Sequence, residues 1–180
     1  MSVSADDHVA EVVLVAARLE ELAQEGHLQL ASLSLLTTAL SKHAVVSAAS
    51  FYERRVLELL LALFTDAPIA IREFVQRKAL DRQFMNLFDF KSTNANTLFK
   101  LFGQDASVEL KKSVEQDPEL PGAIRAFLQI CGERNRLVHN DFSSLETDLS
   151  VGDVISLMTA ADRFLGWLED DLPGFIAGPR

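Results

Sequence analysis

The sequence predicts an all-α protein, a single-domain antiparallel helical bundle with additional short helices. Its 180 residues are 48% hydrophobic, and 8 glycines and 5 prolines supply little turn-forming material for a many-stranded sheet. Apolar residues recur at helical spacing, and no alternating run is long enough to require a strand. The length suits one domain with a sizeable core and is short for two, so we expect one domain over residues 1–180.

Two long helices are expected in the N-terminal part of the chain. The first covers about Ala5 to Leu40 and is broken or bent at Gly26, because glycine interrupts an otherwise helical apolar pattern. The second covers about Lys42 to Phe64, where apolar residues alternate at spacings of four and three, as in a bundle seam. The residues of this seam are Val45, Ala49, Tyr52, Val56, Leu59 and Leu63.

Shorter helices are expected in the middle of the chain. Pro68 suits the first turn of a helix over about 68–80. The stretch DFKSTNANTLFKLFG predicts a polar loop and then a short helix that ends at Gly103. A further helix is predicted over about 105–115, closed by Asp117-Pro118.

The C-terminal part predicts two longer helices and a loose tail. Pro121 opens the first of them, and Ser150-Val151-Gly152-Asp153 resembles a capping box ahead of the second, Val154 to about Asp170. The tail after about residue 172 is expected to be loose.

Cysteine and histidine usage argues against disulfide and metal chemistry. The single cysteine, Cys131, has no partner for an internal disulfide and suits a core position. His8, His27 and His43 do not pair at spacings of three or four with one another or with Cys131, so we expect no metal. We expect no cofactor either, since the sequence has no glycine-rich phosphate loop or dinucleotide fingerprint. The N-terminus lacks the pattern of a signal peptide, and no apolar run approaches the roughly 20 residues of a membrane span. These features predict a cytoplasmic protein without a membrane association.

Charge is distributed unevenly along the chain. The net charge of −9 argues against a protein that coats long nucleic acid, since that binding rests on neutralising phosphates. Residues 67–140, however, carry 11 basic and 9 acidic side chains, whereas residues 1–66 carry 4 and 9 and residues 141–180 carry 2 and 8. Cationic surface is therefore expected in the middle of the chain.

The stretch ERNRLVHNDF, residues 133–142, ends the predicted helix that Pro121 opens. On a helix at about 100° per residue, Asn135 falls inside the apolar stripe, with Arg134 at one edge and His139 near the other. A buried amide without partners costs about 1–3 kcal/mol, so core packing alone does not explain it. A purely structural reading remains open, because cations near a helix C-terminus oppose the macrodipole and Asn140 suits a C-cap. The apolar stripe consists of Ile124, Phe127, Leu128, Cys131 and Val138.

The segment Arg134-Asn135-Arg136-Leu137-Val138-His139 resembles the signature of the HEPN superfamily, an arginine followed after four to six residues by a histidine, with a polar residue directly after the arginine. The phenylalanine-rich loop before Gly103 and the stretch FLQICGERNRLVHNDF are most similar to the RiboL-PSP-HEPN subgroup. The resemblance covers about residues 40–170. Asn140 stands where many relatives have glycine.

This resemblance implies a metal-independent endoribonuclease that acts as a homodimer and leaves 2′,3′-cyclic phosphate and 5′-hydroxyl ends, as in toxins or defence effectors restrained by an antitoxin protein. RNA is the implied substrate. Arg134, Asn135 and His139 are the implied catalytic residues, with Glu53, Arg136 and Asn140 as auxiliary or substrate-binding residues. Glu53 is either a partner of Arg134 in a salt bridge or an exposed edge residue.

The residues themselves also favour a dimer. Arg134 and His139 lie about 140° apart on one helix, too far to hold one phosphate together, and a second copy related by a dyad removes that difficulty. Two alternatives remain. One is a non-catalytic HEPN-like module that binds a protein partner or a nucleotide; the other is a structural, monomeric bundle in which Asn135 is hydrogen-bonded internally.

Overall fold

The computed structural model describes residues 5–26, 29–140 and 145–177, and in these ranges the chain consists of helices and connections without a strand. The predicted all-α fold is confirmed. None of the described helices has the length and apolarity to cross a membrane. The elements are α1 Ala5–Gln24, α2 Leu30–Ala62, α3 Ile69–Val75, the π-helical turn η1 Gln76–Leu80, α4 Phe84–Leu87, α5 Asn96–Lys100, α6 Gln104–Gln116, α7 Leu120–His139, α8 Val151–Asp170 and α9 Leu172–Ala177.

The chain divides into two compact units. The first unit consists of Met1–Phe51 and Ile130–Thr159, and the second of Tyr52–Gln129 and Ala160–Arg180. Helices α2, α7 and α8 each contribute residues to both units. The motif stretch therefore belongs to the first unit.

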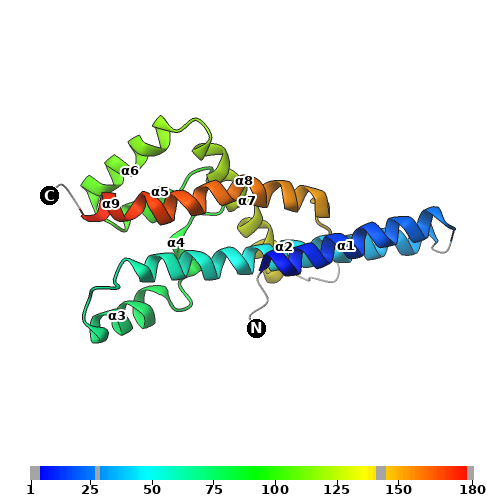
Figure 1. Ribbon diagram of the computed structural model, residues 1–180, viewed down its shortest axis with the longest axis horizontal. Coiled ribbons are helices and arrows are strands. Elements are labelled where there is room, and N and C mark those ends of the chain that lie inside the picture. The colour runs from blue at the N-terminus through cyan, green and yellow to red at the C-terminus, as the bar shows by residue number, and fades with distance from the viewer. Residues whose placement is uncertain (1–4, 27–28, 141–144, 178–180) are drawn as a thin grey trace. The chain divides into compact units, whose positions relative to one another are not determined.

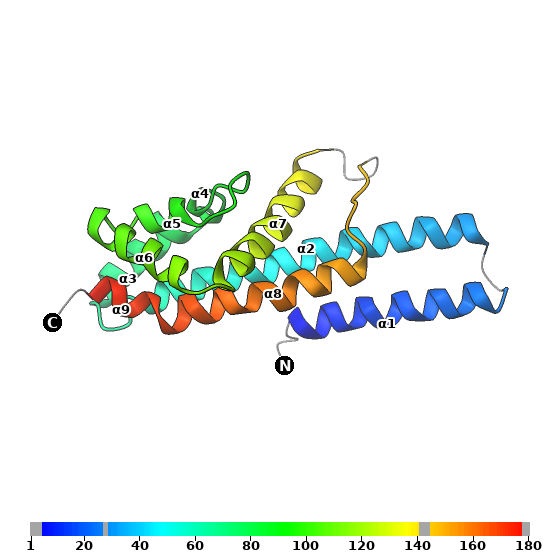
Figure 2. The same ribbon diagram turned by 90° about the horizontal axis from the view of Figure 1, so that it is seen from above.

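In the first unit, α1 runs alongside the beginning of α2 (Figures 1 and 2). The expected break at Gly26 is confirmed: α1 ends at Gln24, and Gly26 has a φ of +77°, a conformation that favours glycine. The expected end of a helix near Leu40 is wrong, because α2 is continuous from Leu30 to Ala62. No glycine or proline lies within α2, so nothing in its backbone chemistry stops the helix there.

The second unit has an aromatic core. The Phe127 ring centroid lies 4.9 Å from that of Phe88 and 5.3 Å from that of Phe164, with tilted or edge-on geometry. Helix α5 packs on α6, and α6 packs on α9. Helix α5 ends at Lys100, and Gly103, with a φ of +93° that favours glycine, stands directly before α6 as its N-cap residue. The predicted stop at Gly103 is therefore three residues late. The buried aromatic residues of this core are Tyr52, Phe84, Phe88, Phe99, Phe127, Phe164 and Trp167.

Two local predictions concern the helix after Pro68 and the C-terminal tail. The helix predicted over 68–80 is present as α3 and η1, directly after Pro68. The loose tail is wrong for residues 172–177: they form α9, in which Leu172 is only 1% exposed and the Phe175 ring centroid lies 6.2 Å from that of Trp167. The tail is helical because it offers two apolar side chains to this core and places Pro173 in a first turn, where proline is tolerated.

The capping box before α8 is confirmed. The Ser150 hydroxyl accepts a hydrogen bond from the Asp153 backbone N–H at 3.1 Å, and the Asp153 carboxylate accepts one from the Ser150 backbone N–H at 2.9 Å. The Ser150 hydroxyl hydrogen bond lowers the pKa of Asp153 below its ordinary value. Helix α8 accordingly begins at Val151, three residues before the predicted start.

Candidate active site

Residues 120–131 of α7, the buried segment, anchor the helix. Asp117 begins it: the Oδ1 atom accepts hydrogen bonds from the backbone N–H groups of Glu119 and Leu120, at 3.0 and 3.2 Å. The Arg163 guanidinium, hydrogen-bonded to Asp117, lowers the pKa of that carboxyl. The buried apolar side chains are Leu120, Ala123, Ile124, Ala126, Phe127, Leu128, Ile130 and Cys131. Cys131 is thus a core residue, as predicted.

Residues 132–139 of α7, the motif segment, are less buried than the first half of the helix. Leu137 is fully buried, whereas Val138 is 47% exposed. The prediction that Val138 continues the buried stripe is therefore wrong. Leu137 lies seven residues after Ile130, on the side of α7 where Ala126 is also buried. The fully buried side chain of the motif segment therefore continues this side of the helix and not the predicted stripe.

Asn135 is half-buried, and its Oδ1 atom is buried without a hydrogen-bond partner among the described residues. The expectation of a polar group inside the apolar stripe is borne out in this respect. The structural alternative, in which the amide is hydrogen-bonded internally, does not account for this oxygen. A buried acceptor without a donor costs about 1–3 kcal/mol and calls for a specific explanation.

Arg134 and His139, the residues expected to react, lie on the same two turns of α7. Arg134 is half-buried. His139, the last residue of the helix, is exposed. Glu53 is half-buried on α2, but it belongs to the second unit and Arg134 to the first. The salt bridge between Glu53 and Arg134 stays a prediction.

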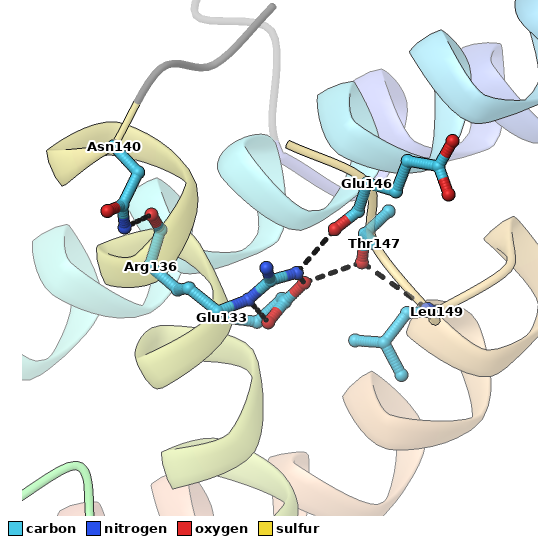
Figure 3. Close-up of polar contacts among 6 residues, drawn as sticks. All are labelled: Glu133, Arg136, Asn140, Glu146, Thr147 and Leu149. Atoms are coloured by element: carbon cyan, nitrogen blue, oxygen red, sulfur yellow. Dashed lines mark hydrogen bonds and ion pairs between the residues drawn. The ribbon is translucent and has the colours of Figure 1, made fainter. Parts of the chain in front are cut away.

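Arg136 is engaged within the chain (Figure 3). Its Nε and Nη2 atoms donate to the two carboxylate oxygens of Glu133, at 2.8 and 2.6 Å, and Nη2 also donates to the backbone carbonyl of Glu146 at 2.6 Å. The Thr147 hydroxyl donates to Glu133 Oε1 at 2.6 Å. We call Glu133, Arg136 and Thr147 the Glu133 clamp, because they tie α7 to the connection that leads to α8.

The hydrogen bonds of the clamp join two charged side chains, the Glu133 carboxylate and the Arg136 guanidinium. The Glu133 side chain is only 15% exposed. The Arg136 guanidinium, and then the Thr147 hydroxyl, lower the pKa of Glu133, and Glu133 in turn raises the pKa of Arg136. Both side chains are therefore held in their charged forms, and the fork of Arg136 faces a carboxylate of its own helix. A direct substrate contact by Arg136 stays a prediction.

Asn140 caps the end of α7. Its Nδ2 atom donates to the backbone carbonyl of Arg136 at 2.7 Å (Figure 3). Asn140 is not among the described residues with a positive φ; Arg82, at 60°, is the non-glycine residue there that has one. Asn140 thus closes the helix through its side chain and not through the left-handed backbone that a glycine would supply. Asp141 and Phe142, which complete the sequence stretch, lie outside the described residues.

Sequence reasoning did not identify Glu133 and Thr147 as site residues. The spacing of three between Glu133 and Arg136 is a recognisable signal for a helical ion pair. The contact of Thr147 spans 14 residues and crosses a connection, so no periodicity reveals it. Among the described side chains, no three of the types His, Cys, Asp and Glu gather as metal ligands would.

A helical chain in which a long helix ends in arginine, asparagine and histidine at this spacing has the form of a HEPN-type module, a class of nuclease-type or nucleotide-binding domains. The family model described as RiboL-PSP-HEPN matches residues 15–170, and the chain belongs to this family. The match begins in α1 and so extends further toward the N-terminus than the resemblance over about 40–170 implied. Searches of curated proteins and of solved structures returned no significant match.

Proposed function

We propose that the protein is a metal-independent endoribonuclease that acts as a homodimer with a composite site. Arg134, Asn135 and His139 of each copy would supply that site, and the products would carry 2′,3′-cyclic phosphate and 5′-hydroxyl ends. A cytoplasmic toxin or defence effector, restrained by an antitoxin protein, is the setting this proposal implies. Family membership supports the class of activity.

One observation carries the proposal: the motif segment contains a buried polar group that packing of the fold does not explain. The Asn135 Oδ1 atom is buried without a partner among the described residues, and His139 stands exposed one turn further along α7. A group that folding leaves unsatisfied is retained at a stability cost, and such costs concentrate at functional sites. A second copy or an RNA strand would supply the missing donor once the side chain adjusts.

The chemistry suits these residue types. A neutral His139 imidazole takes the proton from a ribose 2′-hydroxyl, the 2′-oxygen attacks the adjacent phosphorus, and the bond from phosphorus to the 5′-oxygen breaks. The imidazolium of the second copy's His139 protonates the leaving 5′-oxygen. The Arg134 guanidinium forks onto the phosphate as its negative charge develops. This sequence of steps balances without water or metal and ends at the cyclic phosphate.

Helix geometry supports the proposed dimer. Arg134 and His139 project about 140° apart on α7, so one copy presents them to different sides of the helix. Across a dyad, Arg134 of one copy and His139 of the other converge on one phosphate. Light scattering at assay concentration is expected to report a dimer, and a strictly monomeric active enzyme would contradict the composite site.

The test is RNA cleavage in the presence of a chelator. Wild type is expected to cleave, and His139→Ala is expected to lose about 10²–10⁴-fold in rate, the usual contribution of a positioned acid or base. His43→Ala is the matched control, because His43 is an exposed histidine on α2 outside the motif. Cleavage by wild type that yields 2′,3′-cyclic phosphate, with His43→Ala unaffected, supports the mechanism. Intact RNA with all three proteins would overturn it.

A non-catalytic module that binds a protein partner or a nucleotide is the second candidate. The net charge of −9, together with the engagement of Arg136 by Glu133 and Glu146, favours it by reducing the cationic surface open to RNA. It predicts that wild type and His139→Ala behave alike toward RNA, and that changes in the motif alter dimerisation or partner binding instead.

A further inference from the structure

The Glu133 clamp lies next to the last turn of α7, which carries His139. Arg136 contacts three residues at once: its guanidinium binds Glu133 and the Glu146 carbonyl, and its own carbonyl accepts the capping hydrogen bond from Asn140. His139 lies between Arg136 and Asn140 in sequence. The contacts of Arg136 and Asn140 that Figure 3 draws therefore flank His139 in the sequence of the last turn of α7.

The clamp is also continuous with the start of α8 in the first unit. The Thr147 hydroxyl donates to Glu133 and accepts a hydrogen bond from the Leu149 backbone N–H at 3.3 Å. Ser150, the next residue, forms the capping box with Asp153. Consecutive hydrogen bonds thus connect the end of α7, the residues from Glu146 onward, and the first turn of α8. A helix end that would otherwise fray is tied to a second, capped helix end.

We propose that Glu133, Arg136 and Thr147 are positioning residues that hold His139 in the orientation needed for RNA cleavage. This inference rests on the proposed function. An exposed side chain at a helix end, such as His139, has few packing contacts to fix its position. A displacement of about 1 Å at a reacting group can lower the rate about 10²-fold. The clamp supplies that definition through a charge-assisted network around a carboxylate that is nearly buried.

The inference assigns Arg136 a role different from phosphate binding, and the two roles have different kinetic signatures. A phosphate-binding arginine contributes to substrate affinity and to its salt dependence, so its loss raises KM and reduces the salt slope by about 1. A positioning residue acts on the chemical step, so its loss lowers kcat and leaves KM and the salt slope unchanged.

Thr147 offers the cleanest test, because it bears no charge and can be changed without altering electrostatic attraction to RNA. Thr147→Val keeps the shape and removes the hydroxyl, whereas Thr147→Ser retains it. Glu133→Gln is a second variant that breaks the charge of the clamp, should Thr147→Val fail to fold. Glu21→Gln is the matched control, because Glu21 forms an exposed ion pair with Arg18 at the same spacing of three, 2.7 Å long, on α1.

The measurements are kcat and KM for RNA at several salt concentrations, the pH profile of kcat, and amide hydrogen exchange of α7. We expect Thr147→Val and Glu133→Gln to lower kcat by about tenfold or more, with KM unchanged and faster exchange at residues 136–139. Thr147→Ser and Glu21→Gln are expected to match wild type.

Three outcomes overturn the inference. Clamp variants that cleave like wild type overturn it and leave the proposed function standing. Arg136→Gln is measured beside these variants, and a rise in KM with a reduced salt slope that is confined to it overturns the inference in favour of a direct phosphate contact. Wild-type protein that leaves RNA intact overturns the proposed function itself, and this inference with it.

Discussion

The two halves of α7 share one backbone helix but differ in what their side chains do. In the buried segment, residues 120–131, most side chains are apolar and covered, including Phe127 at the centre of the aromatic core. In the motif segment, residues 132–139, Leu137 is buried, while the remaining side chains are half-buried or exposed and largely polar. The first half stabilises the fold and the second half presents chemistry. Changes in the two halves should therefore separate stability from activity.

The largest effect is expected from Phe127→Ala in the buried segment. Removing a fully buried aromatic ring that contacts Tyr52, Phe88 and Phe164 should lower the free energy of unfolding by about 3–5 kcal/mol. Urea unfolding followed by circular dichroism measures it. Gln129→Ala, an exposed change two residues away, is the control and should remain close to wild type. Equal losses for both variants would contradict the assignment of the core.

Asn135→Leu should have the opposite effect in the motif segment. Replacing the amide with an apolar side chain of similar size removes a buried, unpartnered oxygen, so the free energy of unfolding should stay unchanged or rise by up to about 1–3 kcal/mol. RNA cleavage should be lost at the same time, because stability and function compete at such positions. A variant that is strongly destabilised in urea unfolding, and that loses activity only because it unfolds, would contradict this contrast between the two halves of α7.

A smaller effect is expected where the connection after the motif enters α8. Ser150→Ala removes the hydroxyl that caps the Asp153 backbone N–H and should lower the free energy of unfolding by about 1 kcal/mol. Ser156→Ala is the control, since the Ser156 hydroxyl only donates to the Gly152 carbonyl within the same helix. Thermal melts of both variants measure the difference, and equal stabilities would argue against the capping box.

The smallest expected effect is the loss of stability that Glu133 causes at acidic pH. Arg136 and Thr147 lower the folded-state pKa of Glu133 below its ordinary value of 4.5. A carboxylate with a lowered folded-state pKa contributes stability that is full above the ordinary value and is lost as pH falls through the folded value. The difference in unfolding free energy between wild type and Glu133→Gln should therefore shrink below about pH 4.5. A difference that stays constant, or grows, on acidification would contradict the clamp.

Local patterns predicted the helices well where local chemistry decides them. The break at Gly26, the glycine between α5 and α6 and the capping box at Ser150 all follow from backbone preferences and short-range hydrogen bonds. The boundary near Leu40 was wrong because no local breaker stands there, and the tail after residue 172 was wrong because its helix is stabilised by packing against Trp167.

The candidate site divides in the same way. The positions of Arg134, Asn135 and His139 on one helix follow from the spacing of the motif, and the polar residue inside the apolar stripe is visible in the sequence alone. The engagement of Arg136 is not, because one of its acceptors is the backbone carbonyl of Glu146, ten residues further along the chain. Sequence reasoning placed Arg136 among auxiliary residues and did not anticipate Glu133 or Thr147 beside it.

By itself, the sequence determined that this protein is helical, that its motif ends a long helix, and that Asn135 occupies an apolar stripe, since periodicity and capping act within a few residues. Only the tertiary structure decided which face of the motif segment is buried, that Leu137 and not Val138 fills it, and that Glu133 holds Arg136 and Thr147 together. These choices depend on contacts between segments distant in the sequence, and a one-dimensional pattern carries no signal for such contacts.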